Sequence, residues 1–417
     1  MVPLWIVGKG YSSTGAECST VPSPGLENNE RQCTMYNQKQ MQTSESENIY
    51  RRLQRHLDRM PVAFPATPSG VELRILQRLF TPEEAGIALE LSAIPEPAAN
   101  IHKRFGSRIT LEKLCGELEH MASKGTILAF PVAGEMRYGK MIFAIGMYER
   151  QLKTLTPEFE HESRQYFDEA FGAAFHTGKT TQLRIVPVNK QIAVERGVST
   201  YDRIRAHIEQ SPGPFGTLRC ICRHGHDLLD QPCTRTKLRD NCLMIGPAAQ
   251  WAVDSGSGRA VTREEMLDLL DCADRDGLVL QPENTKSPMF VCCCCGCCCG
   301  VLHSAKRLPR PADFFSTNFY AAVDDAACES CGACEMRCQM DAITSPEGKA
   351  VVDRARCIGC ALCVSTCPSG ALRLEALGHL VDPPDDTKAL YLRMFQERYG
   401  RWGLAKLGAR KLLGMKI

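Results

Sequence analysis

Cysteine is the residue type best suited to chemistry in this sequence, since 23 of the 417 residues are cysteines. Most of them fall into two fields. One spans 328–367, and the other begins near residue 220 and ends in VCCCCGCCCG at 291–300. Disulfides are not favoured in a reducing compartment, and adjacent cysteines fit disulfide geometry poorly. The pattern therefore predicts thiolates that bind metal or take part in redox chemistry.

The clearest pattern is a duplicated motif toward the C-terminus. Residues 328–338 read CESCGACEMRC and residues 357–368 read CIGCALCVSTCP, so the spacing C-x2-C-x2-C-x3-C occurs twice, 29 residues apart. Three closely spaced thiolates can surround one face of a [4Fe-4S] cube, and the fourth cysteine can bind a second cube. A zinc site needs four ligands and gives no reason for this crossed duplication. The motif therefore predicts two [4Fe-4S] clusters.

Both motifs closely resemble those of bacterial-type ferredoxins with two [4Fe-4S] clusters. The resemblance implies a ferredoxin-like fold in which each motif gives its last cysteine to the other cluster. The first implied ligand set is Cys328, Cys331, Cys334 and Cys367. The second is Cys357, Cys360, Cys363 and Cys338. This sequence departs from the family at Gln339, where a proline usually follows the fourth cysteine; Pro368 keeps that proline in the second motif.

A second cysteine field lies in the middle of the chain. It contains CICRHGHDLLDQPC, then DNC, and about fifty residues later the run at 292–299. Successive side chains of an extended strand point to opposite faces, so the cysteines of the run cannot all reach one centre. Gly296 permits a turn that redirects the last three. The candidate metal ligands are Cys220, Cys222, Cys233, Cys242, Cys292, Cys294, Cys295, Cys297 and Cys298.

This central region resembles that of uncharacterised [4Fe-4S] dicluster-domain proteins of anaerobic bacteria. In that pattern a CxCR segment and a later CNCCGCCC-like run precede the ferredoxin repeat, and Cys293 stands here in the place of the asparagine. The resemblance implies one or more further iron–sulfur clusters in the central region. A zinc site and a metal-free thiol cluster are the alternatives.

The elements that position these cysteines indicate an α+β chain of several domains. We expect a flexible leader at 1–48, a winged-helix-like domain at 49–149, an α/β connecting region at 150–215, a cysteine-rich α/β domain at 216–317, the ferredoxin domain at 318–380, and a linker with a basic amphipathic tail at 381–417. Successive helical patterns followed by two strands around a glycine turn suggest the winged helix. Its third helix, near 110–123, is rich in glutamate, so we expect no nucleic-acid partner.

Charge and hydropathy indicate the cellular location of the protein. The net charge is +2, but residues 388–417 carry eight bases and a single acid. Apolar runs are far shorter than the roughly 18 residues of a membrane span, and no basic segment precedes the apolar start, so we expect a cytoplasmic protein. The basic tail is expected to pack on its own domains or on a partner. Contact with the inner face of a membrane is the alternative.

These features favour electron transfer. The chain is expected to relay single electrons through two [4Fe-4S] clusters and an additional central cluster to a redox partner protein, within a larger oxidoreductase complex of an anaerobe. One alternative is a reductase whose central cluster is the catalytic site, with Arg223, His224 and His226 as candidate proton donors or anion binders. A redox-sensing winged-helix regulator is a third reading. No Gly-x-Gly-x-x-Gly fingerprint follows a predicted strand, so hydride chemistry would belong to a partner.

Overall fold

The N-terminal part of the described chain is mainly helical. The computed structural model describes residues 49–188, 203–412 and 415–416, so the leader at 1–48 lies outside the described residues. Residues 49–57 are helical, and four further helices follow: α2 (Val71–Leu79), α3 (Pro82–Ala88), α4 (Ala98–His102) and α5 (Leu111–Ser123). Thr81 and Glu84 form a capping box that fixes the start of α3.

An antiparallel hairpin follows α5. It consists of β2 (Ile127–Val132) and β3 (Glu135–Lys140), and β3 also pairs with the short β1 (Glu96–Pro97). The two turn residues, Ala133 and Gly134, both have positive φ, as a two-residue hairpin turn requires. The helices and the hairpin that the sequence indicated are therefore present. Their interpretation as a winged helix stays a prediction.

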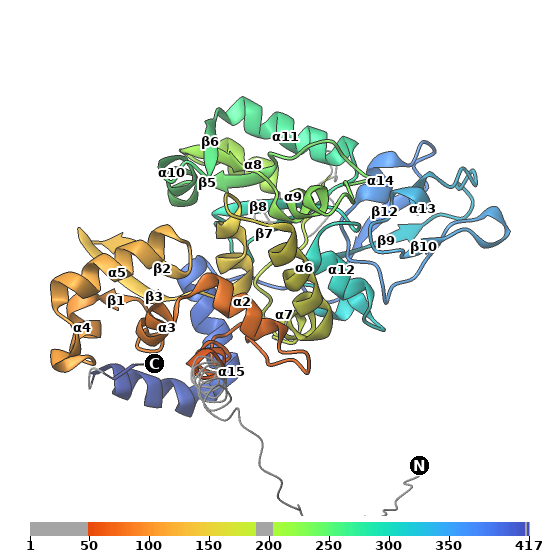
Figure 1. Cartoon of the computed structure of the whole chain (residues 1–417). Helices are drawn as coiled ribbons and strands as arrows, with labels where there is room; N and C mark the ends of the chain where they lie inside the picture. The colour runs from red at the N-terminus through yellow and green to blue at the C-terminus, as the bar shows by residue number, and fades with distance from the viewer. Residues whose placement is uncertain (1–48, 189–202, 413–414, 417) are drawn as a thin grey trace, which may run out of the picture. The chain divides into compact units, whose positions relative to one another are not determined.

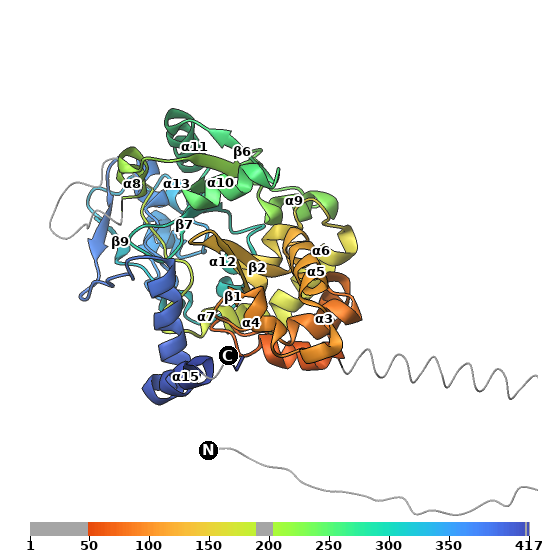
Figure 2. The same cartoon turned by 90° about the vertical axis from the view of Figure 1, so that its left-hand side faces the viewer.

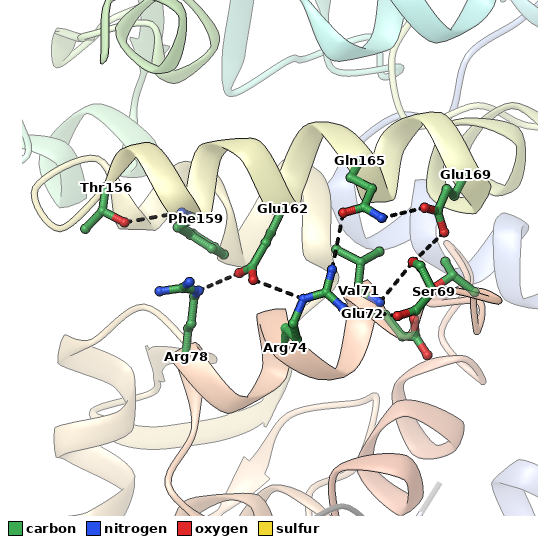
Figure 3. Close-up of polar contacts among 11 residues, drawn as sticks. Ser69, Val71, Glu72, Arg74, Arg78, Thr156, Phe159, Glu162, Gln165 and Glu169 are labelled. Atoms are coloured by element: carbon green, nitrogen blue, oxygen red, sulfur yellow. Dashed lines mark hydrogen bonds and ion pairs between the residues drawn. The ribbon is translucent and has the colours of Figure 1, made fainter. Parts of the chain in front are cut away.

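Two helices of the next segment connect the N-terminal helices to the rest of the chain. They are α6 (Pro157–Tyr166) and α7 (Gly172–His176). The Glu162 carboxylate on α6 accepts hydrogen bonds from Nε of Arg74 at 3.1 Å and from Nε of Arg78 at 2.5 Å, both on α2 (Figure 3). Beneath this contact lies an aromatic cluster of Phe64, Phe143, Tyr166, Phe167 and Phe171.

A five-stranded antiparallel sheet forms the central region. Its strand order is β6-β4-β5-β8-β7. The strands are β4 (Phe215–Leu218), β5 (Cys242–Ile245), β6 (Gly258–Val261), β7 (Val279–Pro282) and β8 (Phe290–Cys294). The helices of this region are α8 (Ile204–Gln210), α9 (Ile221–Leu228), α10 (Pro247–Asp254), α11 (Arg263–Arg275) and α12 (Gly300–Lys306).

The cysteine run begins inside this sheet. Cys292 pairs with Cys242 of β5, whereas Cys293 and Cys294 pair with Leu280 and Val279 of β7. The extended conformation predicted for the start of the run is therefore confirmed. After β8 the chain turns at 295–299 and enters α12, whose N-cap residue is Cys299.

The C-terminal region has a duplicated ferredoxin-like arrangement. The first half contains β9 (Phe319–Val323), α13 (Ala333–Arg337) and β10 (Ile343–Thr344). The second contains β11 (Val351–Val352), α14 (Leu362–Thr366) and β12 (Leu372–Ala376). β9 pairs with β12 and β10 with β11, so each half completes the sheet of the other. Figures 1 and 2 show these blue elements beside the green and cyan central sheet.

The basic tail forms α15 (Thr387–Leu412), which is interrupted at Gly400, where φ is 67°. Leu390 is fully buried, and Arg398 donates a hydrogen bond to the Asp58 carbonyl at 2.5 Å. The first part of the tail therefore packs on its own chain, while Trp402 is 90% exposed. Within the described residues, no helix is long and apolar enough to cross a membrane.

We expect Glu162→Ala to lower the free energy of unfolding by about 1–2 kcal/mol, because it leaves Arg74 and Arg78 without their shared carboxylate. Anaerobic urea denaturation followed by circular dichroism measures this change. Glu119→Ala, at an exposed position of α5, is the control and should change stability by less than about 0.5 kcal/mol. Equal effects of the two substitutions would contradict a stabilising role for the α2–α6 contact.

Candidate metal centres

The first ferredoxin motif surrounds one pocket. We define the outer set as the four cysteines that line it: Cys328, Cys331, Cys334 and Cys367. The chain wraps around this pocket because Ser330 and Gly332 adopt positive φ angles of 58° and 71°. Cys331 is exposed, and backbone hydrogen bonds from Ala350 and Ser330 lower the pKa of Cys328. The outer set thus faces the surface and includes the distant Cys367, as the crossed assignment requires.

The second motif repeats the same backbone geometry. Gly359 and Ala361, each 29 residues after Ser330 and Gly332, have φ angles of 69° and 65°. The sulfurs that lie near one another here are those of the inner set: Cys338, Cys357, Cys360 and Cys363. Burial raises the pKa of Cys360 to about 12. An ionised sulfur at this position therefore needs a nearby cation, which a bound metal would supply.

Two backbone amides point at sulfurs of the inner set. The Ala321 amide donates to Cys357 Sγ at 3.3 Å, and the Ala342 amide donates to Cys338 Sγ at 3.2 Å. Such N–H···S contacts stabilise the negative charge of a ligating thiolate and influence the potential of an iron–sulfur cluster. The environment of the inner set therefore suits thiolates.

The central field separates into two groups of thiols. We define the central tetrad as Cys233, Cys295, Cys297 and Cys298, whose Sγ atoms all lie within 4.8 Å of one another. The Cys233 Sγ lies 3.7 Å from the sulfurs of both Cys295 and Cys297, and Cys297 Sγ lies 3.6 Å from Cys298 Sγ. Hydrogen bonding to Cys295 is the main reason that the pKa of Cys233 falls to about 5.

The second group is a row rather than a compact cluster. We define the central row by hydrogen-bonding contacts between neighbouring thiols, in the order Cys220, Cys222, Cys299, Cys294, Cys292 and Cys242. Hydrogen bonds from Cys292 and Cys299 lower the pKa of Cys294 to about 6. Each central group therefore includes a thiol whose pKa lies below that of an ordinary cysteine.

The structure brings together all nine central cysteines that the sequence predicted, but divides them between the tetrad and the row. Cys299 was missed, because the turn at 295–299 ends the strand alternation on which the prediction depended. Cys293 belongs to neither group, since it points to the other face of β8 from Cys292 and Cys294. No disulfide links the described cysteines.

Arg223 lies between the two groups. It is fully buried, and its guanidinium donates to Asn241 Oδ1 and to the Cys293 carbonyl, each at 2.6 Å. Its Nε has no hydrogen-bond partner, and its two hydrogen-bond acceptors are uncharged. Burial alone would lower the pKa of Arg223, but cysteines of both the row and the tetrad raise it above its ordinary value. The charges that can balance this guanidinium are therefore thiolates.

The ferredoxin-like region contacts the central region beside the inner set. The Gly296 amide, within the turn that carries the tetrad, donates to Gln339 Oε1 at 2.7 Å. A Cβ atom on Gly296 would lie 2.4 Å from the Gln339 carbonyl oxygen, so only glycine allows this approach. Asp274 of α11 accepts from Ser365 at 2.8 Å and forms an ion pair with Arg337. The departure from proline at Gln339 thus has a structural role.

Comparison with known proteins identifies one part of the chain. Residues 315–371 match the family model of a 4Fe-4S dicluster domain. This match agrees with the ferredoxin-like elements and with the two crossed cysteine sets. Neither the comparison with curated proteins nor the comparison with solved structures gave a match.

We expect Arg223→Met to reduce the iron content of the central region while the ferredoxin clusters are retained, because the substitution removes the charge that balances the central thiolates. Iron and sulfide analysis, with electron paramagnetic resonance of the reduced protein, measures both effects. Arg219→Met, at an exposed position close to Cys220, is the control and should keep the wild-type iron content. If the Arg223→Met variant keeps its full iron content, the Arg223 guanidinium is not needed to balance the charge of the central thiolates.

Proposed function

We propose that this protein is an iron–sulfur electron-transfer protein in which a two-cluster ferredoxin domain exchanges electrons with a central cysteine-rich centre. The outer set would hold one [4Fe-4S] cluster and the inner set the other, and such clusters supply one-electron chemistry. The observation that carries this proposal is the hydrogen bond from the Gly296 amide to Gln339, because it joins the residue after an inner-set ligand to the central cysteine run.

The surroundings of the outer and inner sets support a particular order of the electron-transfer sites along the molecule. The outer set includes an exposed cysteine, which suits electron exchange with a separate redox protein. The inner set lies next to the central region through the Gly296–Gln339 hydrogen bond, and the Val188 amide of the connecting segment donates to the Cys360 carbonyl at 3.2 Å. Electrons would therefore pass between partner, outer cluster, inner cluster and central centre, in that order or its reverse.

A short route through bonds connects the inner set to the central row. It runs from Cys338 to the adjacent Gln339, across the hydrogen bond to Gly296, and then through Cys295 to Cys294. We propose that cysteines of the central row ligate the additional iron–sulfur cluster. No three sulfurs of this row lie within 4.8 Å of one another among the described residues, so the row is wider than a single-ion site.

The N-terminal region would bind a protein partner rather than nucleic acid. In the winged-helix interpretation, α5 is the third helix, and it presents Glu112, Glu117 and Glu119. The hairpin exposes Phe130, Val132 and Met136, each about 40% accessible, and such apolar groups favour contact with protein. A cytoplasmic redox complex of an anaerobe fits these properties.

A reductase is the second candidate function, because one histidine of α9, four residues after Cys222, has an unused nitrogen. His226 Nδ1 contacts the Gln231 carbonyl at 2.9 Å, while its buried Nε2 has no hydrogen-bond partner. Burial lowers the pKa of His226, so the ring is neutral at pH 7. Turnover of a small substrate by the isolated protein, with only a chemical reductant added, would favour this function over electron transfer.

Anaerobically purified protein should contain about twelve irons with matching sulfide, four for each of three [4Fe-4S] clusters. Atomic absorption and sulfide analysis of the full chain measure this content. Reductive titration should show the additional cluster as a separate redox transition. An iron content of eight would refute the central cluster while leaving the ferredoxin assignment intact.

We expect Gln339→Pro, the residue usual in ferredoxins, to slow electron transfer between the inner cluster and the central centre without loss of the ferredoxin clusters. This substitution leaves the buried Gly296 amide without a hydrogen-bond acceptor. The contact between the ferredoxin-like region and the central region should therefore weaken by about 1–3 kcal/mol. Rapid photoreduction followed by optical spectroscopy measures the transfer step. Glu329→Ala, exposed beside the outer set, is the control and should keep the wild-type rate. An unchanged rate in Gln339→Pro would exclude this route.

A further inference from the structure

We propose that the central tetrad binds a single zinc ion, with the sulfurs of Cys233, Cys295, Cys297 and Cys298 as its four ligands. This site is distinct from the iron–sulfur clusters of the proposed function and refines that proposal by giving the central region two different metals. The spacing of the sulfurs, the closed ligand set and the position of Cys233 each support the assignment.

The spacing of the sulfurs fits one metal ion. Zinc binds thiolate sulfur at about 2.3 Å, so the four sulfurs of a regular tetrahedron lie about 3.8 Å apart. The three close Sγ–Sγ distances in the tetrad are 3.6, 3.7 and 3.7 Å. In a [4Fe-4S] cube each cysteine binds a different iron at a separate corner, so the cysteine sulfurs must be further apart.

The ferredoxin cysteines provide a comparison inside the same molecule. All eight lie among the described residues, and no three of them have sulfurs that are all within 4.8 Å of one another. The thiols that match a cube-binding motif are therefore widely spaced, whereas those of the tetrad are close together. This difference separates a cluster site from a single-ion site.

The ligand chemistry selects zinc among single ions. Four thiolates in tetrahedral geometry suit zinc or iron, and at a given site zinc binds more tightly than ferrous iron. Four protein ligands leave no open position, which is typical of structural rather than catalytic zinc. All four ligands would bind Zn²⁺ as thiolates, leaving a net charge of −2 beside the buried Arg223 guanidinium.

The zinc ion would anchor a segment that contacts the ferredoxin-like region. Cys233 lies in residues 229–241, which form neither helix nor strand, while the other three ligands lie in the turn after β8. From the same segment, Arg235 donates to the Met336 carbonyl of α13 at 2.8 Å. Zinc would thus hold the irregular segment against the cysteine run and keep Arg235 in place for this contact.

The test uses the full chain, produced in iron-rich medium and purified anaerobically. We expect about one zinc per chain, and zinc-edge X-ray absorption with one shell of four sulfurs at about 2.3 Å. Cys233→Ser should lose the zinc and keep the wild-type iron content, and Cys115→Ser, on α5 and outside every cysteine set, should keep both metals.

Two results would overturn the zinc assignment. One is loss of iron rather than zinc in Cys233→Ser. The other is wild-type zinc that is absent or bound by oxygen and nitrogen, which indicates adventitious metal only. The X-ray measurement on the wild-type protein decides the matter even if Cys233→Ser fails to fold. The iron content and the reductive titration report on the electron-transfer proposal separately, so either proposal can fail without the other.

Discussion

Arg223 is fully buried, and the free energy needed to remove a guanidinium from water is recovered only where anions surround it. Its hydrogen bonds go to an amide and a carbonyl, both neutral, so the compensating charge must come from the cysteines on either side. Metal binding keeps thiols in the thiolate form, so a metal bound here would stabilise the folded central region. The attraction between the Arg223 guanidinium and the surrounding thiolates therefore helps to hold together the central sheet, α9 and the cysteine run.

The same region determines how the ferredoxin-like part is attached. Gln339 and Gly296 meet directly, and Asp274 binds both Arg337 and Ser365 from the two ferredoxin helices. These contacts involve residues within two positions of inner-set cysteines, so a change in the contact between the two regions would alter the surroundings of a cluster bound there. In the proposed relay, electronic coupling and the attachment of the ferredoxin-like region would thus depend on the same few side chains.

The sequence was sufficient where a repeated pattern determines the local structure. The duplicated motif predicted the region that matches a 4Fe-4S dicluster domain, and alternation in β8 separated Cys292 and Cys294 from Cys293. The crossed grouping of the eight ferredoxin cysteines is what the resemblance to ferredoxins implies. The sequence was insufficient where tertiary contacts decide which cysteines come together. The division of the central cysteines into tetrad and row depends on the paths of 229–241 and 295–299, which have no periodic pattern. The positive φ angles of Ser330 and Ala361 could not be predicted from the sequence either, because neither residue is glycine.

Duplication would allow two equivalent halves to act as different ends of the proposed relay. Both halves use the same ligand spacing and the same positive-φ positions, so the cluster geometry that they specify is the same. The difference lies outside the ligands: Pro368 keeps the family residue next to Cys367 of the outer set, and Gln339 replaces it next to Cys338 of the inner set. Solvent exposure and hydrogen bonds set iron–sulfur potentials, so these unequal surroundings would give two bound clusters unequal potentials. The amide side chain in place of a proline ring is therefore one of the differences that distinguish the inner half of this duplicated fold from the outer half.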